Sequence, residues 1–218
     1  MNLPFPAKWF CANAVGLSLG FTAVLQTGFL LQFGLNFEEH WSPAALGQGV
    51  WLGYRFIGLL LGGLIFSAFQ ALALAPRLPR VSAWVGSGAI GYGLVAVIIW
   101  PFWVADVWGR IPGPVEPMII TIGGGSLMGL IQWWHLRGNA VNATKWLLWW
   151  LAGLLVSLPV TFAAFVMLIA VLKLQLPWAG EVALNGLVAG GVAGLISARA
   201  TQSLYFQSAP LRQPRADA

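Results

Sequence analysis

Two nine-residue stretches decide the fold, GGLIFSAFQ at residues 62–70 and GGSLMGLIQ at residues 124–132. Aligned without a gap, each places a small residue, a second small residue four positions later, and a glutamine three positions after that. Offsets of zero, four and seven lie on one face of an α-helix. Gln70 and Gln132 are 62 residues apart, and Trp84 and Trp146 repeat at the same interval. We therefore expect two copies of one helical unit.

A third copy follows, with Ser197 in the place of the glutamine after Gly190 and Gly194 at the same spacing. The helix before each unit carries its own repeated pair, a tryptophan followed seven residues later by a glycine. Seven residues are about two helical turns, so both members share a face. The sequence thus predicts three tandem hairpins of two helices each. The tryptophan–glycine pairs are Trp9/Gly16, Trp84/Gly91 and Trp146/Gly153.

The composition indicates that these hairpins lie in a membrane. Charged residues make up 8% of the 218 residues and hydrophobic residues 59%, whereas a soluble domain has about 25% charged residues. So few charges cannot cover a water-facing surface. Charge-poor stretches of roughly 20 residues or more, the length that a bilayer requires, occupy residues 9–34, 49–75, 82–104, 117–136, 145–172 and 182–204.

The expected fold class is all-α integral membrane, with six transmembrane helices as three tandem helical-hairpin repeats. One transmembrane domain covers residues 1–204, and residues 205–218 are polar and contain proline, which favours a flexible C-terminal tail. Ser82 and Thr144, each two residues before a tryptophan, are the expected N-caps of the third and fifth helices. The repeats lie at about residues 9–75, 82–137 and 144–204.

The basic residues indicate how the chain is oriented. Six spans put both termini on one side, and that side receives eight of the eleven basic residues, while all acidic residues except Asp217 lie on the other. The positive-inside rule then places the N and C termini in the cytoplasm. The net charge of +5 is therefore a topology signal, and we expect no nucleic-acid partner. The eight are Lys8, Arg77, Arg80, Arg137, Lys145, Arg199, Arg212 and Arg215.

Several chemistries have no residues to carry them. The single cysteine, Cys11, excludes an intramolecular disulfide and a multi-cysteine metal site. No nucleotide-binding or hydrolase motif occurs, and no carboxylate or lysine lies near a bilayer midplane, where ion-coupled transporters need one. Glu38, Glu39 and His40 are adjacent in one loop and cannot easily all point at one ion, so we expect no metal site. The sequence therefore favours a protein that is not an enzyme.

The candidate ligand-binding residues are the polar side chains of the repeated units. Gln70 and Gln132 follow two small residues on one face, where close helix packing lets an amide bond across to a neighbouring helix. Interhelical hydrogen bonding is the first interpretation. The alternative is a pseudo-threefold polar chamber in which Gln70, Gln132 and Ser197 converge on a lipid headgroup, a quinone carbonyl or a pigment.

Two further candidates lie near the ends of helices. His135 is expected at the membrane interface beside Trp133 and Trp134; the alternative is pigment ligation, because imidazole can bind a metal or tetrapyrrole and glutamine can bind a chlorophyll magnesium. Arg55 is the one charge well inside a span. We expect it to extend outward, with an anionic ligand as the alternative. Its expected partners are Asp106, Glu116 or Glu181.

The stretch GSLMGLIQWWHLRGNAVNATKWLLWWLAG at residues 125–153 resembles a repeat of uncharacterised multi-pass membrane proteins common in cyanobacteria. That repeat reads Gly-x3-Gly-x2-Gln-Trp-x2-Leu-Arg, a turn, and a tryptophan-rich helix. The first copy here keeps Gln70 without the tryptophan and the Leu-Arg ending, and the third has Ser197. The resemblance implies a photosynthetic or plasma membrane and no particular reaction. The matching residues are Gly125, Gly129, Gln132, Trp133, Leu136 and Arg137.

These observations favour a non-catalytic accessory or assembly subunit of a larger membrane complex. The complex can be photosynthetic, in a bacterial plasma or thylakoid membrane, and the subunit can hold chlorophyll, carotenoid or lipid. The expected partners are membrane lipids and other integral membrane proteins. The alternative is a transport component that binds a small solute or a lipophile.

Overall fold

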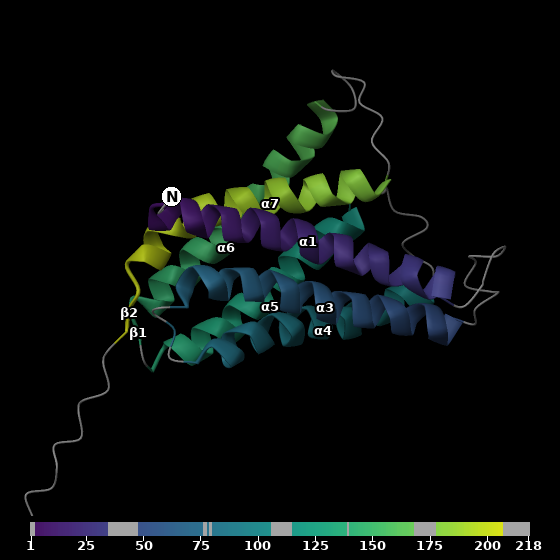
Figure 1. The fold of residues 1–218 in the computed structure, drawn as a ribbon, viewed down its shortest axis with the longest axis horizontal. Helices are drawn as coiled ribbons and strands as arrows, with labels where there is room; N and C mark the ends of the chain where they lie inside the picture. The colour runs from purple at the N-terminus through teal and green to yellow at the C-terminus, as the bar shows by residue number, and fades with distance from the viewer. Residues whose placement is uncertain are drawn as a thin grey trace, which may run out of the picture.

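The computed structural model describes residues 3–34, 48–75, 78, 80–105, 115–138, 140–167 and 178–206. These residues form six long helices that lie side by side, and one pair of two-residue strands (Figure 1). The elements are α1 (Phe5–Gly34), α3 (Gln48–Leu74), α4 (Val81–Val104), α5 (Val115–Leu136), β1 (Ala140–Val141), α6 (Ala143–Val166), α7 (Trp178–Gln202) and β2 (Tyr205–Phe206).

Four helices in the described part of the chain are long and apolar enough to cross a membrane. They belong to α3, α4, α6 and α7, and each holds at least 20 residues, which at 1.5 Å per residue spans about 30 Å. The protein is therefore an all-helical chain suited to a bilayer. The four stretches are Leu52–Leu74, Val81–Val104, Ala143–Ala164 and Ala183–Gln202.

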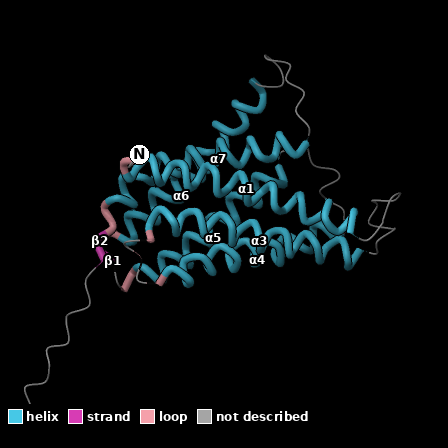
Figure 2. The backbone as a smooth tube through the Cα atoms, viewed as in Figure 1, coloured by secondary structure: helices cyan, strands magenta, loops and turns pink. Residues whose placement is uncertain are grey.

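The helices form a closed ring. Each packs against its neighbours in the chain, and α1 also packs against α7, so the order around the ring is α1, α3, α4, α5, α6, α7 and back to α1. The N-terminal end of α1 and the strands β1 and β2 lie at the same end of the bundle (Figure 2). The last turns of α6, which follow Pro159, project from the bundle (Figure 1). The ring thus joins the first helix to the last.

Glycine allows the closest approach between neighbouring helices. A Cβ atom added at Gly88 on α4 would lie 2.1 Å from the carbonyl oxygen of Gly63 on α3. A Cβ added at Gly190 on α7 would lie 2.2 Å from the carbonyl oxygen of Asn13 on α1. These separations are far below van der Waals contact, so only a residue without a side chain fits at either position.

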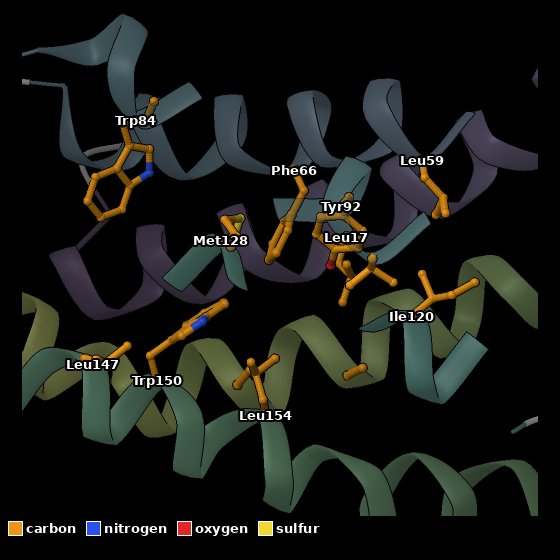
Figure 3. Close-up of a cluster of buried hydrophobic side chains, with 14 of the residues drawn as sticks. Leu17, Leu59, Phe66, Trp84, Tyr92, Ile120, Met128, Leu147, Trp150 and Leu154 are labelled. Atoms are coloured by element: carbon orange, nitrogen blue, oxygen red, sulfur yellow. The ribbon is translucent and has the colours of Figure 1, made fainter. Parts of the chain in front are cut away.

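Aromatic and aliphatic side chains pack together in the core of the bundle (Figure 3). Trp146 contacts Trp84 from α4 with 5.6 Å between ring centroids, and it stacks on Trp150 one turn later at 6.3 Å. Phe66 from α3 meets both Tyr92 and Trp150. Large rings from α3, α4 and α6 therefore share one core.

The expected N-caps are wrong. Helix α4 begins at Val81 after Arg80, and α6 begins at Ala143 after Asn142, so Ser82 and Thr144 lie inside the first turns. Neither observed cap residue makes a capping hydrogen bond through its side chain. Asn142 adopts a left-handed conformation, with φ of 67°, and this turn in the backbone starts the helix earlier than the sequence suggested.

A short antiparallel strand pair lies at the end of the bundle beside this turn. Ala140 and Val141 pair in antiparallel fashion with Phe206 and Tyr205. The Asn142 side-chain amide donates to the Ser203 carbonyl at 3.2 Å. The segment expected as a flexible tail, residues 205–218, thus begins with a paired strand, and its residues 207–218 lie outside the described residues.

Candidate functional site

The candidate site begins on α1, where Trp9 and Asn13 occupy successive turns of one face. Both are fully buried, and the Asn13 amide nitrogen donates to the Trp9 carbonyl at 2.8 Å. This bond fixes the Asn13 side chain so that its oxygen points away from its own helix. Asn13 therefore presents a hydrogen-bond acceptor to the neighbouring helices.

A chain of three amides crosses the bundle from α5 to α1. The Gln132 amide nitrogen donates to Gln70 Oε1 at 3.1 Å, and the Gln70 amide nitrogen donates to Asn13 Oδ1 at 2.8 Å. We call Gln132, Gln70 and Asn13 the amide chain. All three side chains are 0% exposed. Because lipid provides no hydrogen-bonding partners, buried amides in a membrane must bond to one another or to the backbone.

Ser197 on α7 joins this network through Trp9. The Trp9 indole nitrogen donates to Ser197 Oγ at 3.0 Å, and Ser197 Oγ donates to the Ala193 carbonyl at 2.7 Å. One turn further, Thr201 accepts from the Trp146 indole at 3.1 Å and donates to the Ser197 carbonyl at 2.9 Å. Polar contacts therefore link α1, α3, α5, α6 and α7 at one level of the bundle.

The structure brings the repeated polar residues into one network, and they do not all touch. Gln70 and Gln132 bond directly, whereas Ser197 reaches them through Trp9 and Asn13. Asn13 was not singled out from the sequence. A signal was present, because Trp9, Asn13 and Gly16 repeat the zero, four, seven spacing of the second helices on the first.

Four buried polar atoms have no hydrogen-bond partner among the described residues. Gln132 Oε1 lies at the start of the amide chain, and Trp84 Nε1 lies on the neighbouring helix α4. The other two are the Tyr92 hydroxyl and Thr161 Oγ1. Native proteins leave few such groups unpaired, so each needs an explanation.

Arg55 forms an ion pair at the opposite end of the bundle. Its guanidinium contacts Glu116 Oε1, the same oxygen that accepts from the Trp103 indole at 2.7 Å. The guanidinium carbon also lies 5.2 Å from the centre of the Trp103 ring. Glu116 is one of the three partners expected from the sequence; Asp106 and the Glu181 side chain lie outside the described residues. Both side chains are about a quarter exposed, 25% and 22%.

His135 lies away from the amide chain. It is exposed, three residues after Gln132, on the last turn of α5. Beside it, the Arg137 guanidinium carbon lies 3.2 Å from the centre of the Trp134 ring and 5.6 Å from that of Trp133. This end of α5 thus combines a cation with aromatic rings, an arrangement typical of a membrane interface.

The described residues contain no group of three histidine, cysteine, aspartate or glutamate side chains that could hold a metal ion. The loop residues Glu38, Glu39 and His40 lie outside the described part of the chain. Within the amide chain, Gln132 Oε1 is the oxygen without a hydrogen-bond partner among the described residues, and Gln132 is 0% exposed. The protein itself therefore covers this oxygen.

Comparison with known proteins identified no matching family model, no matching curated protein and no matching solved structure.

Proposed function

We propose that this protein is a non-catalytic accessory or assembly subunit of a larger membrane complex. The observation that carries the proposal is the complete burial of the amide chain. Gln132, Gln70 and Asn13 bond to one another and are 0% exposed, so they hold helices together and do not line an accessible surface. A solute-binding transporter would need at least one of these amides to face a pathway.

The proposed architecture is six transmembrane spans in three tandem hairpins. Within each hairpin, the repeated glycine of the first helix packs against one fixed position of the second helix. That position lies three residues after the first small residue of the repeated unit. The contacts are Gly16 on Phe66, Gly91 on Met128 and Gly153 on Ala193. Between hairpins, the residue four positions after each repeated tryptophan contacts the first small residue of the unit in the hairpin before it, and the first hairpin contacts the third in the same way. These contacts join Asn13 to Gly190, Gly88 to Gly63 and Trp150 to Gly125. Equivalent positions making equivalent contacts support an internal repeat with a rough threefold axis.

The proposed orientation puts both termini in the cytoplasm. Five described basic residues are exposed at the end of the bundle that carries β1 and β2, whereas the described ion pair of Arg55 and Glu116 lies at the other end. Cytoplasmic ends of membrane helices carry an excess of basic residues. The five are Lys8, Arg80, Arg137, Lys145 and Arg199.

The outer surface provides room for partners. Large apolar side chains point outward from every helix of the ring, with exposed fractions of 60% for Ile98, 60% for Leu155 and 65% for Leu195. In a membrane these side chains contact lipid tails or other membrane proteins. Carotenoid, chlorophyll or lipid held between this surface and a partner fits the proposal, and a photosynthetic setting rests on the sequence resemblance alone.

The test is purification from native membranes in a mild detergent, followed by mass spectrometry and an absorbance spectrum. The proposal predicts stoichiometric membrane-protein partners, and Gln132→Leu should lower the yield of the assembled complex. Gln202→Leu is the matched control, because Gln202 is an exposed glutamine at the end of α7. A protein that purifies alone and colourless, or a Gln132→Leu variant that assembles normally, would contradict the proposal.

The second candidate is a component that binds a small solute or a lipophile for transport. The observation in its favour is that two buried oxygens, Gln132 Oε1 and the Tyr92 hydroxyl, have no hydrogen-bond partner among the described residues. A solute bound at either oxygen should raise the melting temperature by an amount that grows with the logarithm of its concentration above the dissociation constant. A melting temperature that no solute changes would leave the accessory function as the better explanation.

A further inference from the structure

Trp84 differs from three other buried tryptophans of the bundle, which are hydrogen-bonded. The indoles of Trp9, Trp146 and Trp150 are also fully buried, and each donates to an oxygen within 3.1 Å. Trp84 is 2% exposed, and its Nε1 has no partner among the described residues. An indole nitrogen is a donor only, so what it lacks is an acceptor.

Gln132 carries the complementary unpaired group, an acceptor. Its amide nitrogen donates to Gln70, whereas its Oε1 has no partner among the described residues. An amide oxygen is an acceptor only. A donor without an acceptor thus lies on α4, and an acceptor without a donor lies on the adjacent helix α5. Leaving both groups unpaired and out of reach of bulk water would be costly.

The two groups lie on contacting faces of antiparallel neighbours. Helices α4 and α5 touch at Gly91, where an added Cβ would lie 2.5 Å from the Met128 backbone nitrogen. Trp84 is two turns from this contact and Gln132 is one turn from it, toward the same end of the bundle. At 1.5 Å per residue their Cα atoms are offset by about 4–5 Å along the helix axes. In Figure 3 the indole nitrogen of Trp84 lies on the side of the ring nearer Met128.

We propose that one buried water molecule binds between Trp84 and Gln132, accepting from Trp84 Nε1 and donating to Gln132 Oε1. A hydroxyl group can do both, whereas a quinone carbonyl only accepts and an ammonium only donates. The two groups are closed off from the surface, because Trp84 is 2% exposed and packs against the Trp146 ring, and Gln132 is 0% exposed. Buried waters that satisfy internal polar groups are a regular part of protein structures. This inference does not depend on the partner complex proposed above.

The first test replaces Trp84 by benzothienylalanine, in which sulfur takes the place of the indole N–H and the shape is kept. With the water in place, Trp84→benzothienylalanine removes a bond and lowers the melting temperature. Without it, the change removes an unpaired buried donor and raises the melting temperature or leaves it unchanged, which overturns the proposal. Trp9→benzothienylalanine is the matched control, because it removes the known bond to Ser197 and should lower the melting temperature.

The second test asks whether one molecule joins the two side chains. Gln132→Met is measured alone and together with Trp84→benzothienylalanine; the lost bond to Gln70 is common to both backgrounds and cancels. A shared water predicts a combined decrease in melting temperature smaller than the sum of the single decreases, and additive decreases overturn it. An NMR cross-peak between the Trp84 indole proton and water should be present and should disappear in Gln132→Met. Its absence from the unmodified protein also overturns the proposal.

Discussion

Gln70 is the residue on which the buried polar network depends most. It accepts from Gln132 and donates to Asn13, so it joins α5 to α1 through α3. The other two members depend less on the chain. Asn13 also donates to the Trp9 carbonyl of its own helix, and Gln132 makes a single bond in the chain, to Gln70. Removing Gln70 therefore breaks the network in the middle.

We predict that Gln70→Leu lowers stability more than Gln132→Leu. Gln70→Leu leaves the Gln132 nitrogen and Asn13 Oδ1 without their partners, at about 1–3 kcal/mol for each buried unpaired group. Of the partners in the amide chain, Gln132→Leu leaves Gln70 Oε1 alone unpaired. Unfolding of the purified protein in mixed detergent micelles measures the difference, with Gln202→Leu as the exposed control. Equal losses of stability in the two variants would mean that Gln70 does not hydrogen-bond to both Gln132 and Asn13 as the distances indicate.

We predict a small effect at the ion pair of Arg55 and Glu116. Both side chains are about a quarter exposed, so solvent and headgroups screen the interaction to about 1 kcal/mol or less. Glu116→Gln keeps an acceptor for the Trp103 indole, whereas Glu116→Leu removes it. Glu116→Leu should therefore cost more stability than Glu116→Gln in thermal unfolding. The reverse order would show that charge matters more here than the Trp103 hydrogen bond.

Sequence reasoning located part of this network, and the reason is geometric. Gln70, Gln132 and Ser197 stand out because the same spacing recurs on three helices. Asn13 does not, since its counterparts four residues after the other two tryptophans are Gly88 and Trp150. The direction in which each amide donates depends on side-chain rotation, which no spacing encodes. The sequence leaves three acidic residues as possible partners of Arg55, because a long side chain near a helix end can reach several neighbours.

The contact between α3 and α4 is the closest packing between two helices described above. Gly88 and Gly63 bring the two backbones together, and Ser67 adds a bond from its hydroxyl to the Val85 carbonyl at 2.7 Å. No rearrangement of a flexible side chain can make room at Gly88, because the nearest atom is a backbone oxygen. This pair of helices therefore tolerates no added volume at that point.

We predict that Gly88→Ala separates these helices and Gly86→Ala does not. The added methyl group at Gly88 would lie 2.1 Å from the Gly63 oxygen, whereas nothing lies within 4 Å of the corresponding position at Gly86. Overpacking of this kind costs about 1–3 kcal/mol. Thermal unfolding of both variants in detergent tests the prediction. A Gly88→Ala protein as stable as Gly86→Ala would mean that the α3–α4 contact is looser than described.

Hydropathy predicts most helix ends to within a few residues, because a helix satisfies all the backbone hydrogen bonds of an apolar stretch in lipid. The residues that cap the helices and the strands that follow them are harder to predict. The turn at Asn142 depends on its left-handed backbone and on a bond to Ser203, 61 residues away. The strand pair of β1 and β2 likewise depends on contacts remote in the sequence, so local patterns gave no sign of it.

We predict that the two ends of the whole bundle face opposite sides of the membrane. In a Cys11→Ser background, Gly138→Cys places an exposed thiol after α5 and Ala105→Cys places one after α4. A membrane-impermeant maleimide should label Ala105→Cys in intact cells and Gly138→Cys only after permeabilisation. The opposite pattern would reverse the orientation, and labelling of both from one side would contradict the proposed spans.

The bond that closes the ring has a consequence for biosynthesis. Trp9 and its acceptor Ser197 are 188 residues apart, so α1 enters the membrane long before α7 exists. At about 5–20 residues per second, the ribosome needs about 10–40 s to supply the partner. During that interval the Trp9 indole on the first helix has no Ser197 acceptor, and this part of its polar face stays unpaired. A chain that stops before its last helix cannot close the ring, and the Trp9 indole then keeps no acceptor on α7.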